Sequence, residues 1–274
     1  MAMPVRQGSA PHDTSFGIAA EGTWRGACGS GTMAASSTWR YRSVARTDVG
    51  LVRTRNEDGL VDRPEDGLWA VVDGMGGHAG GARASGLIRD ALAQLATIPD
   101  VDAWVSAVRA RIEEVHAQLH ATAGRAGSTV VVLLALGGRF ACIWAGDSRL
   151  QRWRGGQLER LSRDHSLLEE LVASGTVPPE QAHRHPLANR ITRAVGIGQR
   201  LELEVVRGEF APGDRYLLSS DGLHGVVRET LIAEIMATPD LELAADRLIA
   251  AVRQAGAPDN VTIVLVGVER AAGS

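Results

Sequence analysis

The sequence of 274 residues contains no lysine. All 29 of its basic residues are arginine, and against 32 acidic residues they leave a net charge of −3. So balanced a charge implies no polyanion-binding surface, and we expect no nucleic acid among the partners. Because the arginines are spread evenly along the chain, we attribute the missing lysine to coding bias and infer no function from it.

Cysteine and long apolar runs are also scarce. Cys28 and Cys142 alone can form neither a disulfide framework nor a thiolate metal cluster, which favours a reducing, cytosolic setting. The longest apolar runs, such as 130–136 and 263–268, are far shorter than the roughly 20 residues of a membrane-spanning helix. Residues 1–20 lack a basic start followed by an apolar block, so they do not resemble a secretory signal. We expect a soluble, cytoplasmic protein with no membrane partner.

The composition that remains is typical of a globular protein, with 45% hydrophobic and 22% charged residues. Residues 1–38 are rich in Gly, Ala, Ser and Thr and show no hydrophobic period, so they are predicted to form a flexible N-terminal extension. A folded domain is expected over 39–270, followed by a short tail over 271–274.

Hydrophobic periodicity within this domain predicts groups of strands that alternate with pairs of helices. The Gly137-Gly138 dipeptide favours a tight hairpin between two of the strands. This order is typical of the α+β class, in which antiparallel sheets form a β-sandwich flanked by pairs of α-helices, rather than of a doubly wound parallel sheet. The expected strands are 41–47, 68–72, 129–136, 139–144, 150–154, 201–207, 215–219 and 261–268, and the expected helices are 82–96, 101–120, 228–237 and 241–255.

Carboxylates lie at five ends of these predicted strands. Divalent cations such as Mg²⁺ and Mn²⁺ prefer oxygen ligands, so acids that converge from several strands could build a metal site. Any single Asp-Gly pair is better explained as a common turn, and only the joint occurrence favours a site. The acids are Glu57 and Asp58 after the first strand, Asp73 at the end of the second, Asp147 and Asp221 after two later strands, and Asp259 before the last.

A pair of histidines and one arginine are two further candidates for parts of a site. His116 and His120 are one helical turn apart, but no HExxH arrangement or cysteine pair accompanies them, so we expect an ordinary amphipathic helix there rather than a zinc site. Arg53 precedes the Glu57-Asp58 pair and could grip a phosphate group in a bidentate manner. Taken alone, Arg53 could equally be a solvated loop residue.

Seven segments of the chain resemble, in order, the signatures of the metal-dependent protein phosphatase family, type 2C, in its bacterial branch. The resemblance extends from about residue 42 to residue 268 and implies a four-layer αββα fold and hydrolysis of phosphoserine or phosphothreonine with Mn²⁺ or Mg²⁺. The segments are TDVGLVRTRNED at 47–58, VDGMGGHAGG at 72–81, AGST at 126–129, AGDSR at 145–149, RDHS at 163–166, SSDGL at 219–223 and PDNVT at 258–262.

The resemblance also implies which residues bind metal. Two ions, or three with a weaker bacterial site, would be held by acids and one carbonyl oxygen. Two such cations lower the pKa of a bridging water, and the resulting hydroxide attacks phosphorus without a covalent enzyme intermediate. The implied ligands are Asp73 between two ions, Glu57 and the Gly74 carbonyl on one of them, Asp221 and Asp259 on the other, and Asp147 with Asp221 on the third.

Three other residues receive roles by the same resemblance. Arg53 matches the phosphate-binding arginine, and Asp58 would hold metal-bound water. Eukaryotic members carry a histidine directly after the Asp-Gly pair, whereas this chain has Met75 there and His78 as its nearest histidine. His78 could protonate the leaving oxygen as a general acid, or metal-bound water could do so.

The long polar stretch over 167–198 resembles the mobile flap of the family, although a plain surface excursion with one short helix is the alternative. We therefore expect a monomeric, cytoplasmic protein serine/threonine phosphatase that acts on phosphoproteins and opposes a bacterial Ser/Thr kinase. One alternative is a catalytically silent module that binds phosphoproteins, and others are a hydrolase of small phosphoesters and a Ca²⁺ structural site.

Overall fold

The computed structural model describes residues 39–76, 80–121, 126–178 and 190–270, and these form two sheets whose strand pairs are all antiparallel. The first sheet has the order β1-β11-β10-β7-β8, with strands β1 (Trp39–Asp48), β11 (Val261–Arg270), β10 (Arg215–Ser219), β7 (Arg149–Arg154) and β8 (Gln157–Arg160). The second has the order β2-β3-β5-β6-β9, with strands β2 (Asp58–Arg63), β3 (Leu68–Met75), β5 (Val130–Leu136), β6 (Arg139–Ala145) and β9 (Glu204–Glu209), while β4 (Gly127–Ser128) pairs with β3.

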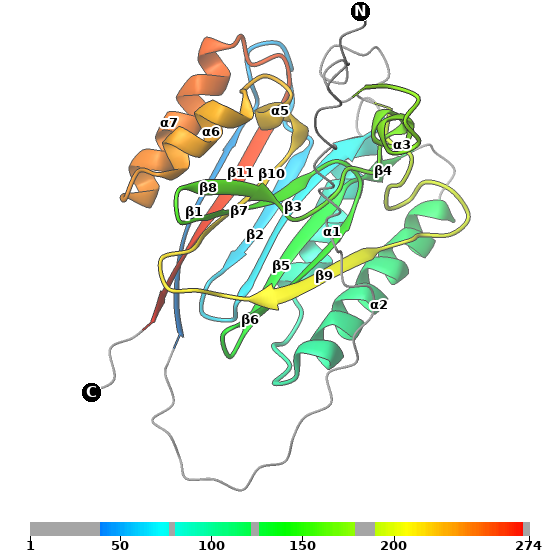
Figure 1. Ribbon diagram of the computed structural model, residues 1–274. Coiled ribbons are helices and arrows are strands. Elements are labelled where there is room, and N and C mark those ends of the chain that lie inside the picture. Colours follow the sequence, from blue (N-terminus) through cyan, green and yellow to red (C-terminus); the bar gives the residue numbers. More distant parts are fainter. Residues whose placement is uncertain (1–38, 77–79, 122–125, 179–189, 271–274) are drawn as a thin grey trace, which may run out of the picture. The chain divides into compact units, whose positions relative to one another are not determined.

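Helices cover the outer face of each sheet (Figure 1). The second sheet packs against α1 (Gly80–Ala93) and α2 (Val101–His120), and the first packs against α5 (Asp221–His224), α6 (Glu229–Met236) and α7 (Leu241–Gln254). The remaining described helix is α3 (Leu167–Ala173). No described helix combines the length and the apolar character that a membrane span requires. The expected α+β sandwich is confirmed.

The strands in the middle of each sheet are buried on both faces, which explains their continuous apolar runs. In β3, Leu68, Ala70 and Val72 belong to the core beneath α1 and α2. The alternate residues Trp69 and Val71 belong to the core between the two sheets. All five side chains are buried. Both faces of the strand are therefore apolar over residues 68–72, and apolar and polar residues do not alternate there.

The structure corrects several predicted boundaries. Four described elements were missed, namely β2, β4, β8 and α5, because short segments with polar residues give no clear hydrophobic period. Helix α3 lies where only the alternative of a surface excursion placed a short helix. The first predicted helix occupies 80–93 instead of 82–96, and the strand expected at 201–207 occupies 204–209. The bounds of α2 and β10, and the Gly137-Gly138 hairpin between β5 and β6, match the prediction.

Candidate active site

The five aspartates come from both sheets and meet near one end of the sandwich. Asp58 and Asp73 belong to β2 and β3 and face each other as a register pair. Asp147 lies in the turn from β6 to β7, Asp221 begins α5 after β10, and Asp259 lies two residues before β11. Ser220, beside Asp221, donates from Oγ to Asp58 Oδ2 over 2.8 Å and thus links the two sheets at this point.

Two of the predicted positions need correction. Glu57 and Asp58 do not simply follow a strand, because Asp58 is the first residue of β2. Asp73 does not end its strand, because β3 continues to Met75, where Gly74 and Met75 pair with β4. The backbone of Asp73 is fixed by Thr129, whose N–H donates to the Asp73 carbonyl over 2.9 Å.

Burial and mutual repulsion raise the pKa values of these acids. Burial is the main cause for Asp58, whose pKa rises to about 7, and for Asp147, whose pKa rises to about 8 with repulsion from Asp221. Burial and the charges of Asp58 and Asp221 hold the pKa of Asp73 well above its usual range. Burial and the charge of Asp259 raise the pKa of Asp221, and a hydrogen-bonding contact with Asp73 lowers it in part.

The donor set fits a hard divalent cation. It consists of oxygen ligands only, and the buried Asp147 Oδ1 has no hydrogen-bond partner within the described chain. No three acidic, histidine or cysteine side chains among the described residues already stand in an arrangement that would hold one ion. Ion binding at these acids would release the protons that their raised pKa values retain.

The Glu57 side chain lies against Gly81, and neither Gly81 nor the neighbouring Gly74 has room for a Cβ atom. A Cβ on Gly81 would collide with Glu57 Oε2, and a Cβ on Gly74 would collide with the carbonyl oxygen of Gly81. The N–H of Gly74 donates to the Glu57 carbonyl over 3.2 Å. The structure therefore brings Glu57 and Gly74 together at the start of α1, and both belong to the ligand set that the resemblance implies.

Arg53 lies beside Asp259 at the exposed edge of this cluster. Its Nη2 donates to Asp259 Oδ2 over 2.7 Å, and the Arg53 side chain is 57% exposed. The hydrogen bond to Asp259, followed by the charges of Asp259, Glu57 and Asp221, raises the pKa of Arg53. Arg53 is thus a permanent cation with one side open to solvent, as a residue that grips a phosphate group must be.

Asn260, which the sequence reasoning did not single out, fixes the loop that carries these residues. Its Oδ1 accepts from the N–H of Glu57 over 2.8 Å, and its Nδ2 donates to the carbonyls of Val49 and Arg55 over 2.9 Å each. Asn260 is buried, so these bonds do not compete with water. Its place in the PDNVT segment was the available signal.

We expect Asn260→Ala to lower the free energy of unfolding by about 2–4 kcal/mol, because three backbone groups lose their buried partner. Chemical denaturation followed by circular dichroism would measure this change. Asn56→Ala is the comparison variant from the same loop. We expect it to cost about 1 kcal/mol, because the Asn56 amide donates to Thr47 at an exposed position and its Oδ1 accepts from only one backbone N–H, that of Asp58. Equal losses in the two variants would contradict this role of Asn260.

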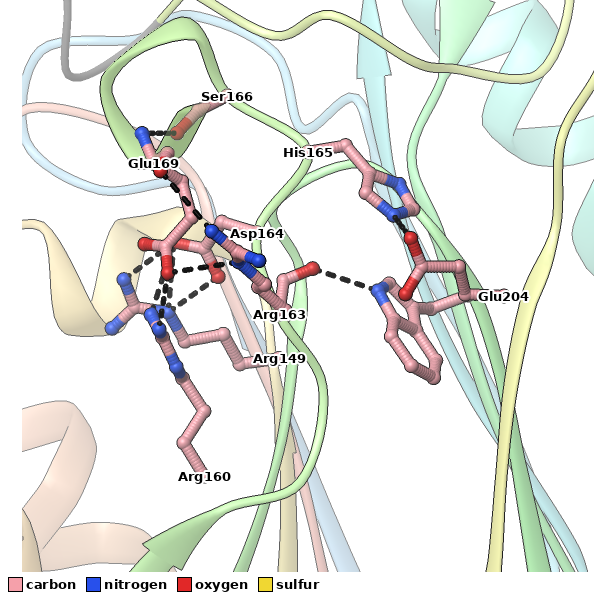
Figure 2. A network of polar contacts seen from close by, with 9 residues as sticks. Arg149, Arg160, Arg163, Asp164, His165, Ser166, Glu169 and Glu204 are labelled. Atoms are coloured by element: carbon pink, nitrogen blue, oxygen red, sulfur yellow. Dashed lines mark hydrogen bonds and ion pairs between the residues drawn. The ribbon is translucent and has the colours of Figure 1, made fainter. Parts of the chain in front are cut away.

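His165 holds the turn that carries Asp147. The imidazole Nδ1 accepts from the N–H of Gly146 over 3.1 Å, and the His165 N–H donates to the Gly146 carbonyl over 2.9 Å. Because Nδ1 accepts, the proton lies on Nε2, which donates to Glu204 Oε1 over 3.0 Å (Figure 2). Burial lowers the pKa of His165, which keeps this neutral form. The RDHS segment was the only sequence signal for this role.

The start of the predicted flap is tied to the first sheet by ion pairs. Arg149 of β7 forms a bidentate contact with Asp164, and Arg160 and Arg163 both reach Glu169 of α3 (Figure 2). Although burial alone would raise the pKa of Asp164, its bond with Arg149 lowers it. Residues 167–178 and 190–198 of the predicted flap are described, and 179–189 lie outside the described residues.

Two histidine predictions have different outcomes. His116 is buried in α2 and stacks on His120, and its Nδ1 accepts from the N–H of Gly196 over 3.0 Å. This contact gives His116 a structural partner, in agreement with the expected ordinary helix. His78 lies outside the described residues, so its role as a general acid stays a prediction.

Comparison with known proteins identifies relatives over the same region. The family model described as protein phosphatase 2C matches residues 53–259. The serine/threonine protein phosphatase PstP of Mycobacterium tuberculosis is 38% identical over 238 residues, which cover 83% of this chain and 45% of PstP. The serine/threonine phosphatase stp of Listeria monocytogenes is 32% identical, with 81% of this chain and 93% of that protein covered. The chain thus spans about half the length of PstP.

Solved structures agree in fold over the whole of their chains. The catalytic domain of PstP, crystallised in complex with two manganese ions, is 37% identical and has a TM-score of 0.76, with 85% of this chain and 100% of that chain covered. PppA, a regulatory component of T6SS in Pseudomonas aeruginosa, is 40% identical and has a TM-score of 0.77, with 84% and 100% covered. The sandwich, the acid cluster and these matches lead to one conclusion, that the chain belongs to the protein phosphatase 2C family.

Proposed function

We propose that this protein is a metal-dependent phosphatase that hydrolyses phosphoserine and phosphothreonine in other proteins. The observation that carries the proposal is a cluster of aspartates from two sheets whose pKa values are raised by burial and mutual repulsion, with an exposed arginine on Asp259. Clustered carboxylates destabilise the fold when no cation is bound. Arg53, which contacts Asp259, places a positive charge that can bind phosphate directly beside the cluster. The names of the relatives support the same activity.

The oxygen ligands on this chain would hold two Mn²⁺ or Mg²⁺ ions, and a third more weakly. When bound, the ions supply a hydroxide at neutral pH and neutralise charge on the phosphoryl oxygens. The manganese complex of the PstP catalytic domain supports this choice of metal. The residues that would hold them are Asp73 between two ions, Glu57 and the Gly74 carbonyl on one side, Asp221 and Asp259 on the other, and Asp147 with Asp221 at the third.

The remaining residues act on the substrate and its protons. Arg53 would turn its exposed side toward the phosphate and grip two oxygens as the bond to the leaving oxygen lengthens. Ser220 orients Asp58 by donating to Oδ2, so that the carboxylate can accept a hydrogen bond from the attacking water. The leaving oxygen takes its proton from His78 or from water. Hydrolysis rates of His78→Ala and of the unmodified protein, compared on substrates whose leaving groups differ in pKa, distinguish these two proton donors.

The proposal extends to setting and organisation. We propose a cytoplasmic monomer that reverses the action of a Ser/Thr kinase in signalling. Residues 39–270 would be the phosphatase domain, with 167–198 as its flap, 1–38 as an extension and 271–274 as a tail. Size-exclusion chromatography with light scattering at micromolar concentration checks the oligomeric state.

Competition between substrates tests the choice of protein over small phosphoesters. With Mn²⁺ present, we expect kcat/KM for phosphothreonine peptides to exceed that for free nucleotides by at least about 100-fold, because peptides add binding contacts that are lost in smaller substrates. Phosphate release from each substrate, measured singly and in mixtures, gives this ratio. A preference for nucleotides would make the protein a small-phosphoester hydrolase, and binding of the peptide without turnover would make it a silent phosphoprotein-binding module.

A further inference from the structure

Leu51 and Val52 form an exposed apolar patch directly before Arg53, here called the Leu51–Val52 patch. Their exposed fractions of 62% and 67% are the two highest among the large apolar residues of the described chain. Single exposed aliphatic residues are common on protein surfaces. Leu51 and Val52 are adjacent and directly precede Arg53, and neither contributes to the core. Exposure of both side chains to water is unfavourable, so this pair needs an explanation that a single exposed residue does not.

The backbone beneath the patch is fixed, so the patch cannot simply turn inward. The N–H of Leu51 donates to the carbonyl of Ala257 over 2.8 Å. Gly50 has a φ of +80°, and a Cβ at that position would collide with the carbonyl oxygen of Asp259. Leu51 and Val52 are therefore held against the same segment that carries Asp259.

The position of the patch indicates what would cover it. Arg53 follows Val52 in the chain and contacts Asp259 over 2.7 Å, so the patch borders the charged cluster. Residues of an extended peptide are spaced by about 3.3 Å, and a phosphorylated residue that reaches Arg53 brings its neighbours over the adjoining surface. An aliphatic neighbour would remove the patch from water, whereas a polar neighbour would lose contacts with water there.

We propose that Leu51 and Val52 form a specificity subsite that contacts an aliphatic side chain one or two residues from the phosphorylated serine or threonine of the substrate. This inference rests on the proposed function and adds the class of substrate sequence to it. A free nucleotide or another small phosphoester has no such neighbour and cannot use the subsite.

Two phosphothreonine peptides of equal length and charge test the subsite, one with leucine and one with serine at the two positions on each side of phosphothreonine. The values of kcat/KM with Mn²⁺ are compared for the unmodified protein, the Leu51→Ser/Val52→Ser double variant and Leu243→Ser. Leu243 is the matched control because it is 51% exposed but lies on α7. We expect the unmodified protein and Leu243→Ser to prefer the leucine peptide by about tenfold. In the double variant this ratio should fall to within about twofold of unity.

Two outcomes would overturn the subsite while leaving the proposed function intact. One is equal kcat/KM for the two peptides in the unmodified protein, and the other is an unchanged preference in the double variant. Failure of the unmodified protein to hydrolyse either peptide would overturn the proposed function, and the subsite with it. Because the readout is a ratio within each protein, partial loss of metal or of active molecules does not alter it.

Discussion

Asp73→Asn is expected to lower phosphate release from a phosphothreonine peptide by at least about 10³-fold in the presence of Mn²⁺. Asp73 stands at the centre of the acid cluster, where it faces Asp58 across β2 and β3 and hydrogen-bonds to Asp221. Asparagine has nearly the same shape but no charge, and it cannot bridge two cations as a carboxylate does. The measurement is the steady-state rate for both proteins, each with Mn²⁺ and with EDTA.

The control for Asp73→Asn is Asp90→Asn, which removes one charge from an exposed position of α1. We expect Asp90→Asn to retain activity within about twofold. EDTA should abolish phosphate release by the unmodified protein. It should not lower the residual rate of Asp73→Asn by a comparable factor. Activity that survives both EDTA and the substitution would show that the proposed metal centre is wrong.

Mn²⁺ is expected to raise the melting temperature by about 5–10 °C, and by more at pH 8.5 than at pH 7. The unfolded chain releases aspartate protons near pH 4, whereas Asp58 and Asp147 have folded-state pKa values of about 7 and 8. Between these limits the folded state holds more protons than the unfolded state, so stability without metal falls as the pH rises. A bound cation offsets the repulsion between the deprotonated acids.

Buried histidines oppose this trend only at lower pH. Burial lowers the pKa of His224 to about 3 and also lowers that of His165, so both stabilise the fold as the pH rises toward 6.5. Their contribution is complete above that value. The interval from pH 7 to 8.5 therefore reports the acids together with the buried Cys142 thiol, whose pKa burial raises, so that it lowers stability in the same direction as the pH rises. Differential scanning calorimetry at both pH values, with EDTA and with Mn²⁺, measures the four melting temperatures.

Asp147→Asn separates the acid cluster from other causes of this pH dependence. Without metal, the variant should melt at a higher temperature than the unmodified protein at pH 8.5, and its melting temperature should change less between pH 7 and 8.5. Asp246→Asn, at an exposed position of α7, should leave the pH dependence unchanged. Identical melting temperatures in EDTA and Mn²⁺ at both pH values would refute the expected metal linkage.

The sequence alone predicted those elements that have a clear local signal, such as a regular spacing of apolar residues or a turn dipeptide. The period of apolar residues in α2 places its bounds at 101–120, and the Asp100 side chain caps its first turn by accepting from the Ala103 N–H. The dipeptide Gly137-Gly138 predicted the β5–β6 hairpin for an equally local reason, because both residues have positive φ. Ordered motifs likewise identified the family before any geometry was known.

Only the tertiary structure decided how distant segments meet. Ser220 and Asp58 are 162 positions apart, and Asn260 and Glu57 are 203 apart, yet each pair forms a hydrogen bond that positions the acid cluster. Strand β2 was not recognised because its six residues become a strand through pairing with β3 rather than through their own pattern. Residue types and local periods are written in the sequence, whereas pairing, burial of charge and the resulting pKa values depend on contacts between remote segments, and the chemistry of this site follows from those contacts.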